Sequence, residues 1–299
     1  MKVAIIGSNS FLAKYIIREF INCNIKPTLF GTLPSAEFPN LEFYHFKIPI
    51  VSIPNSTLLE FDIIIYTAGA GIQSGLKESL EIIYELNCFY PIKLINFFSQ
   101  NNFRGIVITF GSYFEIGDEK EELFYTEIQV ALSNKQVPNH YSSSKRILTR
   151  FLISSPDLPN HFHFILPNIY GKGENQNRLI PYLIDSIREA TEVKLTSGSQ
   201  IRQYIHGTDV SKAVLNVVTN GYPKGLYNLC NSEAVQIKEL VRNVYKVMNR
   251  EADFLKIEFG SNQRADTSMD YLLLNNNKAT FTLKFSPSIS LQEGLSSYL

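Results

Sequence analysis

The first two thirds of the chain alternate short apolar runs with longer stretches in which apolar residues recur at every third or fourth position. Each short run is bounded by Gly, Pro, Asn or polar residues, as strands are. The longer stretches, such as Phe11–Ile21 and Leu80–Phe98, predict amphipathic helices between the strands. Strands that are apolar on both faces and separated by helices predict an α/β fold with a doubly wound parallel sheet. The predicted strands are Val3–Ile6, Pro27–Phe30, Leu41–Phe46, Asp62–Thr67, Gly105–Phe110 and Phe162–Leu166.

After about Asn168 the pattern changes to shorter, mixed pieces, which predict a smaller mixed α/β domain. We expect one domain from residues 1–168, together with parts of 200–230, and a second that comes mainly from 169–299, with a cleft between them. The predicted helices are Leu179–Ala190, Asp209–Asn220, Lys238–Met248 and one that begins at Ser290, and the predicted strands are Val193–Thr196, Arg202–His206, Leu226–Leu229 and Leu255–Phe259.

The charges balance, with 28 basic and 28 acidic residues in 299. Proteins that coat nucleic acid or anionic membranes carry a basic excess, so we expect neither partner. No stretch reaches the roughly 18 apolar residues of a membrane-spanning helix, and the run Val3–Ile6 is too short for a signal peptide. Cys23, Cys88 and Cys230 have neither metal-ligand nor redox spacing, which predicts free thiols and a cytoplasmic location.

The turn after the first strand is a candidate phosphate site. A dinucleotide fold needs a tight turn there, close approach of the backbone, and helix amino-terminal N–H groups that face the pyrophosphate. Gly7 supplies one glycine, while Ser10 and Ala13 stand where a G-x-x-G-x-x-G loop would carry two more. An ordinary strand-to-helix turn is the alternative. The candidate cofactor contacts in this turn are Gly7, Ser8, Ser10, Phe11 and Leu12.

The end of the second predicted strand bears on which cofactor would bind. NAD enzymes usually place a carboxylate there for the ribose 2′-hydroxyl. Here the residues are Gly31 and Thr32, with no carboxylate and no adjacent arginine. We therefore expect NADP or NAD as cofactor, with a preference for NADP.

Tyr141 and Lys145 lie four residues apart, on one face of a predicted helix. A nearby ammonium favours the phenolate, which would lower the pKa of Tyr141 and make it a usable general acid and base. About one Tyr-x-x-x-Lys is expected by chance in this composition, so the pair alone carries little weight. Its value comes from Ser112, whose hydroxyl follows a predicted strand at the sheet edge where ligands of such folds bind.

These motifs appear in the order found in one family. The chain resembles the extended short-chain dehydrogenase/reductases, in particular the NAD-dependent epimerase/dehydratase group that acts on nucleotide sugars. The resemblance continues through Arg202-Gln-Tyr-Ile-His206-Gly-Thr-Asp209 and covers nearly the whole chain. Its motifs are Gly7-x-x-Ser10-x-x-Ala13, Thr67-Ala68-Gly69-Ala70, Asn87, Ser112, Tyr141-x-x-x-Lys145 and Pro167-Asn168-Ile-Tyr170-Gly171.

The resemblance implies a Rossmann-like NAD(P)-binding domain, a carboxyl-terminal substrate domain and a shared mechanism. Hydride would pass between a sugar carbon and the nicotinamide, while Tyr141 exchanges the proton of the sugar oxygen. Lys145 would hold the nicotinamide ribose, and Ser112 would bind the reacting oxygen. The further residues implied for the cofactor are Ala68, Gly69, Asn87 and Pro167, and those for the substrate are Ser112, Tyr113, Asn168, Arg202 and Arg264.

The chain also departs from the family. Dehydratases of this group place an Asp-Glu pair directly after the catalytic hydroxyl residue, where this chain has Tyr113 and Phe114. This difference argues against dehydration and leaves C4 epimerisation or reduction of a 4-keto sugar. Glu115, one position later, is interpreted as structural.

The absence of residues that usually contact the cofactor leaves a second class of function open. The loop Phe46–Pro49 lacks the aspartate that usually contacts adenine, as expected for a dinucleotide-binding regulator without catalysis. Such regulators typically lose the Tyr/Lys pair, and its retention here favours an enzyme. His161, His163 and His206 are interpreted as packing residues rather than metal ligands. The helix that contains Phe89 and Phe97 commonly contributes to a dimer interface in the family, which implies a homodimer.

Overall fold

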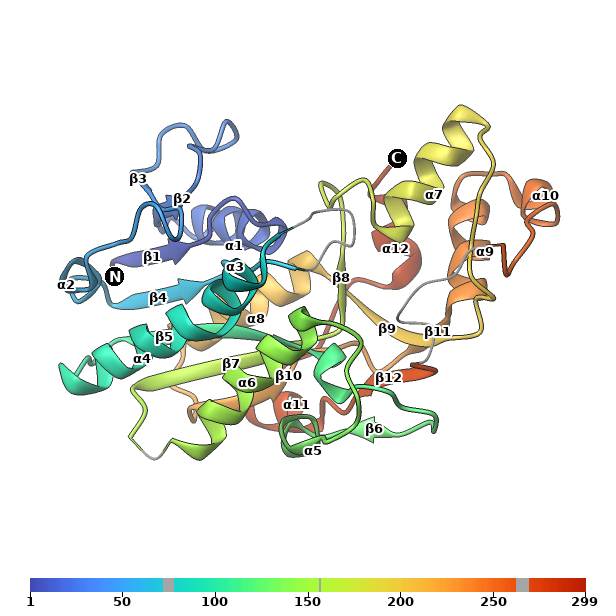
Figure 1. Cartoon of the computed structure of the whole chain (residues 1–299). Helices are drawn as coiled ribbons and strands as arrows, with labels where there is room; N and C mark the ends of the chain where they lie inside the picture. The colour runs from blue at the N-terminus through green and yellow to red at the C-terminus, as the bar shows by residue number, and fades with distance from the viewer. Residues whose placement is uncertain (72–77, 156, 262–268) are drawn as a thin grey trace.

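Seven parallel strands form the main sheet, in the order β10-β7-β5-β4-β1-β2-β3 (Figure 1). The computed structural model describes residues 1–71, 78–155, 157–261 and 269–299. The strand order reverses between β1 and β4, which is the crevice where open α/β sheets bind ligands. The strands are β1 (Val3–Ile6), β2 (Thr28–Gly31), β3 (Phe43–His45), β4 (Ile63–Tyr66), β5 (Ile106–Ser112), β7 (Asn160–Leu166) and β10 (Gly225–Asn228).

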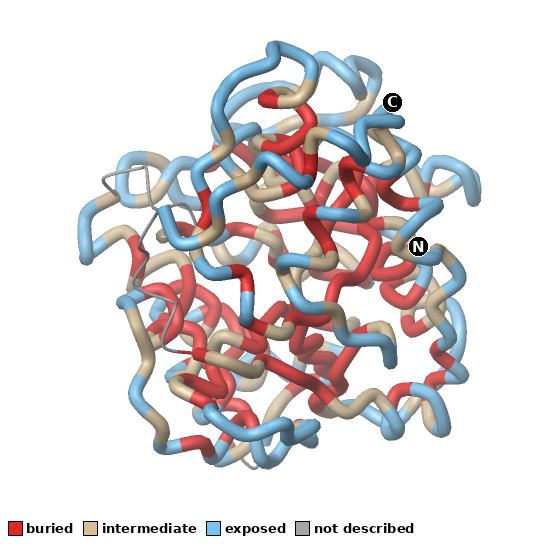
Figure 2. The backbone as a smooth tube through the Cα atoms, turned by 90° about the vertical axis from the view of Figure 1, so that its right-hand side faces the viewer, coloured by how far each residue is buried: buried red, intermediate tan, exposed pale blue. Residues whose placement is uncertain are grey.

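Side chains alternate between the two faces of this sheet, and both faces are covered. In β1, Val3 and Ile5 belong to one core cluster, whereas Ala4 and Ile6 belong to the other. Because both faces are buried, the strands contain continuous apolar runs rather than an alternating pattern. Figure 2 shows the result, with buried backbone through the middle of the molecule and exposed backbone around its edge.

Helices form a layer on each face of the main sheet. On one face α1 packs against α8, and their apolar residues, such as Ile16 and Val214, share one core. On the other face Phe98 of α4 and Leu148 of α6 belong to the second core. The helices of these layers are α1 (Phe11–Asn22), α8 (Gly207–Thr219), α11 (Asn277–Leu283), α3 (Leu80–Tyr84), the π-helical η1 (Glu85–Phe89), α4 (Tyr90–Gln100) and α6 (His140–Ser154).

A second, mixed sheet has the order β11-β9-β12-β6, with β8 also paired to β9. It packs against α7, α9 and α12 around Tyr170, Tyr204 and Leu240 (Figure 1). Its strands are β6 (Phe124–Tyr125), β8 (Asn168–Tyr170), β9 (Ile201–His206), β11 (Ala234–Gln236) and β12 (Tyr271–Leu274). The remaining helices are α2 (Asn55–Leu58), the 3-10 turn η2 (Tyr113–Ile116), α5 (Glu127–Leu132), α7 (Leu179–Glu189), α9 (Ile237–Val247), α10 (Glu251–Phe254) and α12 (Leu291–Ser296).

The structure confirms the predicted α/β class and the parallel sheet, but two predicted strands are wrong. Val193–Thr196 and Leu255–Phe259 meet only through one isolated bridge, between Leu195 and Phe259. Val193, Leu195, Ile257 and Phe259 pack into the α7/α9 core without forming a ladder, whereas Leu255 is exposed. The expected single helix Leu80–Phe98 is divided by η1. No helix in the described ranges is long and apolar enough to cross a membrane.

Candidate active site

The turn between β1 and α1 leaves helix N–H groups facing the sheet edge. Gly7 has φ +89°, and a Cβ atom there would overlap the backbone of Ala68, so only glycine fits. Ser10 caps α1 by accepting a hydrogen bond from Ala13 N–H at 3.2 Å. The N–H groups of Phe11 and Leu12 have no partner within the helix, and the first turn holds no acidic residue. A bound anion therefore meets donors and no opposing carboxylate.

Asn9 is a residue of this turn that the sequence interpretation missed. Its Oδ1 accepts hydrogen bonds from the N–H groups of Thr32, at 2.7 Å, and Leu33, at 3.2 Å. A Cβ atom on Gly31 would lie 2.5 Å from Ser8 Oγ, so glycine is required for this close packing as well. The amide thus joins the end of β2 to the turn, which is one use of Asn in turns.

Asn87 joins two other segments beneath the site. It lies fully buried in η1, where its Oδ1 accepts from Ala70 N–H at 3.0 Å. Its Nδ2 donates to Ala70 O at 2.8 Å and to Ser144 Oγ at 3.0 Å. Both of its N–H groups are therefore used within the protein. The residue fixes the loop after β4, which contains Ala68 and Gly69, against α6.

Ser112, Tyr141 and Lys145 come together at the carboxyl end of β5. Ser112 ends that strand, and α6 begins with Asn139 as its N-cap, which places Tyr141 and Lys145 one turn apart. The Ser112 side chain hydrogen-bonds Tyr141. Lys145 Nζ donates to Phe110 O at 2.9 Å and lies 6.0 Å from the centre of the Tyr141 ring. Two distant segments thus build a hydroxyl, phenol and ammonium cluster.

The electrostatics of this cluster correct one expectation. Burial raises the pKa of Tyr141 to about 12, the Ser112 hydrogen bond opposes this rise, and the Glu115 carboxylate adds to it. Burial also lowers the pKa of Lys145 to about 8. The expected lowering of the Tyr141 pKa is therefore wrong for the chain alone, because desolvation of the phenolate outweighs the Ser112 hydrogen bond and the Arg178 charge. Tyr141 is a protonated phenol at neutral pH.

The predicted substrate residues are placed unevenly. The prediction that Tyr113 binds substrate is wrong, because its side chain is fully buried in the core, edge-to-face with Phe114 at 5.1 Å between ring centres. Asn168 follows the buried Pro167 and hydrogen-bonds Tyr204 of the second sheet. Arg202 is almost fully buried and donates to Met269 O at 2.7 Å and to Asp270 O at 3.1 Å. Arg264 lies outside the described residues.

Arg178 is a cation that the sequence interpretation missed. Burial raises the pKa of both Tyr141 and Tyr204, and the Arg178 charge opposes the rise in both. Its Nε is 3.0 Å from the Glu174 Oε2, and Glu174 is buried and accepts a hydrogen bond from the Tyr298 hydroxyl. The sequence did contain a signal for this ion pair: an arginine stands directly before a predicted helix, four residues after a glutamate.

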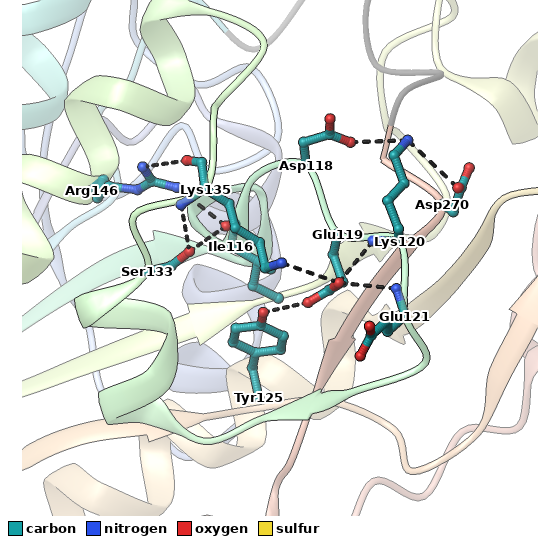
Figure 3. A network of polar contacts seen from close by, with 10 residues as sticks. All are labelled: Ile116, Asp118, Glu119, Lys120, Glu121, Tyr125, Ser133, Lys135, Arg146 and Asp270. Atoms are coloured by element: carbon teal, nitrogen blue, oxygen red, sulfur yellow. Dashed lines mark hydrogen bonds and ion pairs between the residues drawn. The ribbon is translucent and has the colours of Figure 1, made fainter.

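A polar network follows the 3-10 turn η2 and joins Glu119 and Lys120 to Tyr125 and Asp270 (Figure 3). Glu119 is buried and accepts hydrogen bonds from the Tyr125 hydroxyl and from Lys120 N–H, the latter at 2.8 Å. Its carbonyl accepts from Asp270 N–H at 2.9 Å, and Lys120 Nζ pairs with the Asp270 carboxylate at 3.5 Å. Asp270 O also accepts a hydrogen bond from the Arg202 guanidinium, so the loop that follows η2 holds a backbone carbonyl to which this arginine donates.

The buried histidines belong to the packing of β5 and β7. Thr109 Oγ1 lies 3.1 Å from His161 Nε2 and 2.8 Å from His163 Nδ1. Burial lowers the pKa of both rings, to about 3 for His161. His206 is also buried, edge-to-face with Tyr15 and Tyr170. Within the described ranges no group of three His, Cys, Asp or Glu side chains could hold a metal ion.

Comparison with known proteins decides the family. The model of the NAD-dependent epimerase/dehydratase family matches residues 3–230. The chain belongs to this family. This confirms the resemblance deduced from the ordered motifs, and the match runs from β1 to the end of β10.

Individual members of the family are distant. The CDP-abequose synthase of Salmonella typhimurium is 27% identical over 140 residues, which are 45% of this chain and 46% of that protein. The dTDP-4-dehydro-6-deoxy-D-allose reductase of Streptomyces bikiniensis is 35% identical over 89 residues, 28% of this chain and 27% of that protein. The chain therefore matches less than half the length of these two relatives.

A solved family structure extends the likeness over the whole chain. The dTDP-glucose 4,6-dehydratase of Bacillus anthracis, crystallised with NAD, superposes with a TM-score of 0.81 and 17% identity. The superposition covers 99% of this chain and 94% of that one. At this identity the likeness demonstrates the fold, and the chemistry has to be argued from the residues.

Proposed function

We propose that the protein is an NAD(P)-dependent oxidoreductase or epimerase that acts on a nucleotide-activated sugar. The observation that carries the proposal is the meeting of Ser112, Tyr141 and Lys145 at the carboxyl end of β5, in a chain of the epimerase/dehydratase family. The reaction is C4 epimerisation or reduction of a 4-keto sugar.

The residues of the first turn fit a dinucleotide. Gly7 allows the backbone to approach a diphosphate, and the N–H groups of Phe11 and Leu12 face it without an acidic neighbour. Asn9 holds Gly31 and Thr32 beside the turn, where an adenosine ribose would lie. When bound, the nicotinamide supplies or accepts the hydride. Lys145, buried at the other end of the site, would hold the nicotinamide ribose.

The protonation state of Tyr141 favours the reductive direction. With a pKa of about 12 in the chain alone, the phenol holds its proton at neutral pH. A protonated phenol can donate to a carbonyl oxygen while hydride arrives at its carbon, which is the step that ketone reduction requires. Ser112, hydrogen-bonded to Tyr141, orients the same oxygen. Oxidation of an alcohol, the first half of epimerisation, would instead need Tyr141 to lose its proton first.

Substrate binding falls to the second part of the chain in this proposal. Residues 1–168, with parts of 200–230, form the NAD(P)-binding domain, and residues 169–299 mainly bind the nucleotide sugar. Arg178 and Arg202 supply planar guanidinium groups that suit a diphosphate, and Asn168 lies beside Tyr204 at the same cleft. Glu174 fixes Arg178 at the entrance to α7.

Dehydration is not part of the proposal, although a family neighbour is named a dTDP-glucose 4,6-dehydratase. Water elimination needs an additional acid and base beside the transferred hydrogen. The two positions directly after Ser112 offer only the buried phenol of Tyr113 and the apolar ring of Phe114. The residues therefore support proton transfer through Tyr141 alone.

Preference for NADP is the finer part of the cofactor proposal. The end of β2 carries Gly31 and Thr32 rather than a carboxylate that would repel a 2′-phosphate. Calorimetric titration of the purified protein is expected to give a lower dissociation constant for NADP than for NAD. Tighter binding of NAD would contradict the preference.

Replacement of Tyr141 by Phe tests the reaction. The variant keeps the ring and its packing but loses the proton, so turnover with a nucleotide-linked 4-keto sugar should fall by about 100-fold or more. Cofactor affinity should be nearly unchanged. A panel of UDP-, dTDP-, CDP- and GDP-linked sugars would supply the substrate, and unchanged turnover in the variant would refute the proposed role.

The second candidate function is a dinucleotide-binding regulator without hydride transfer. The observation that favours it is the single glycine in the first turn, where Ser10 and Ala13 replace the other two glycines of a glycine-rich loop. This candidate predicts cofactor binding with no oxidation of the reduced cofactor by any sugar of the panel. Oxidation with one of them would eliminate it.

A further inference from the structure

A buried carboxylate lies one turn beyond the catalytic serine. Glu115 has no exposed surface, and its Oε1 accepts a hydrogen bond from Ser112 N–H at 2.7 Å. The Ser112 Oγ in turn accepts from Phe114 N–H at 3.3 Å, which closes a capping box around η2. Glu115 therefore fixes the backbone from which the catalytic hydroxyl projects.

The surroundings of this carboxylate explain how it fits there. Gly111 has no side chain, and a Cβ atom on it would lie 2.7 Å from Glu115 Oε1 and 2.6 Å from His163 Nε2. Thr149 hydrogen-bonds the carboxylate from α6. The Arg146 guanidinium binds the backbone of Glu115 rather than its carboxylate, since Arg146 Nε donates to the Glu115 carbonyl oxygen at 2.9 Å. Lys145, on the same helix, donates its Nζ to Phe110 O at 2.9 Å, two residues before the Ser112 N–H from which Glu115 accepts, and its charge opposes the rise in the Glu115 pKa.

Of the other ionisable groups around Glu115, Arg146 carries a charge that also opposes the rise in the Glu115 pKa. From α6 come Tyr141, a neutral phenol, and Arg146, and from β7 comes His163, whose pKa burial holds well below its usual value. Two further elements pack against η2. Glu127 of α5 accepts a hydrogen bond from Asn228 N–H at 2.9 Å, and β12 offers only the phenol of Tyr271.

A cap alone does not require a charge. Glutamine forms the same capping box as glutamate, and burial of a carboxylate is costly. The charge of the Glu115 carboxylate opposes the lowering of the Lys145 pKa by burial. Lys145 has to remain an ammonium to bind a ribose hydroxyl and to favour the phenolate of Tyr141.

We propose that Glu115 is a positioning residue whose negative charge keeps the buried Lys145 protonated while its Oε1 fixes Ser112. The proposal rests on the function proposed above, because it assigns Lys145 and Ser112 to the reaction. Burial lowers the pKa of Lys145 to about 8 and raises that of Glu115 to about 6, and each charge opposes the effect of burial on the other. Both groups are charged between these two values.

Titration of Lys145 tests this directly and without substrate. The protein is labelled with ¹³C at lysine Cε, and the Lys145 signal is assigned with Lys145→Met. In Glu115→Gln the cap can form but the charge is gone, so the midpoint of the Lys145 signal should move down by about one pH unit, a tenfold change in the protonation constant. The control Glu121→Gln removes an exposed carboxylate from the neighbouring loop and should leave the midpoint unchanged.

The pH dependence of kcat/KM provides a second readout. The wild-type profile should fall below about pH 6 and above about pH 8, and Glu115→Gln should lose the acid limb and move the basic limb to lower pH. An unchanged Lys145 midpoint in Glu115→Gln would overturn the proposal. If the variant does not fold, titration of the wild type still tests the proposal. Its Lys145 signal must then show a second inflection near pH 6, where Glu115 gains or loses its proton. Failure of Tyr141→Phe to lose turnover would instead refute the proposed function.

Discussion

Glu115 should destabilise the folded protein at neutral pH. Its pKa is raised from 4.5 to about 6, with full burial as the largest cause. A carboxyl with a raised pKa binds its proton more tightly in the folded state. Folding is therefore unaffected below the unfolded pKa of 4.5 and is penalised as pH rises through about 6. A shift of about 1.5 units corresponds to about 2 kcal/mol at 1.36 kcal/mol per unit.

Replacement of Glu115 by Gln should remove this penalty. The free energy of unfolding of the variant, relative to wild type, is expected to rise from near zero at pH 4 to about 2 kcal/mol in favour of the variant above pH 7. The interaction with Lys145 is already included, because the Glu115 pKa reflects that charge.

Urea unfolding followed by circular dichroism between pH 4 and pH 8 measures the difference, with Glu121→Gln as an exposed control. A difference that does not vary with pH would refute the reasoning, since a change in packing or capping alone has no such dependence. A wild type that becomes the more stable protein above pH 6 would refute it more directly, because the carboxylate would then be stabilising.

Two further predictions concern the borders of the site. Gly7→Ala should lower the free energy of unfolding by about 2–4 kcal/mol and abolish cofactor binding, because φ is +89° and the added Cβ meets Ala68; near-normal thermal stability and affinity would contradict this. Tyr298→Phe removes hydroxyl contacts with Gly171 N–H and with the buried Glu174, so we expect a loss of about 1.5–3 kcal/mol in denaturant unfolding and a higher KM, through Arg178. An unchanged KM would separate Arg178 from substrate binding.

The main sheet could be predicted because its signals are local. Alternation of short apolar runs with helical periodicity depends only on neighbouring residues, and every parallel strand buried on both faces needs such a run. The predicted run Leu226–Leu229 also became a strand, β10. The runs around Leu195 and Phe259 were equally apolar but found no strand edge, so they pack as core without a ladder. Strand pairing is a long-range property that a local pattern does not contain.

The order of Ser112, Tyr141 and Lys145 along the chain was sufficient to predict that they meet. Ser112 lies at the end of a strand, and Tyr141 and Lys145 lie one turn apart on a helix. Parallel strands end at the same edge of a sheet, which is where ligands bind. Their titration could not be predicted, because the pKa of Tyr141 depends on how deeply α6 buries it. The sequence alone suggested the opposite sign.

The sequence by itself therefore determined the class of fold, the family and the meeting of Ser112, Tyr141 and Lys145, all of which depend on local periodicity and ordered motifs. Tertiary structure alone decided the roles of Asn9, Arg178 and Glu115. Each of these acts through a partner distant in sequence or through burial: Asn9 binds Thr32, and Arg178 influences Tyr141. Burial and desolvation are set when the two sheets and their helices pack, and they determine which of these polar groups keep their charge.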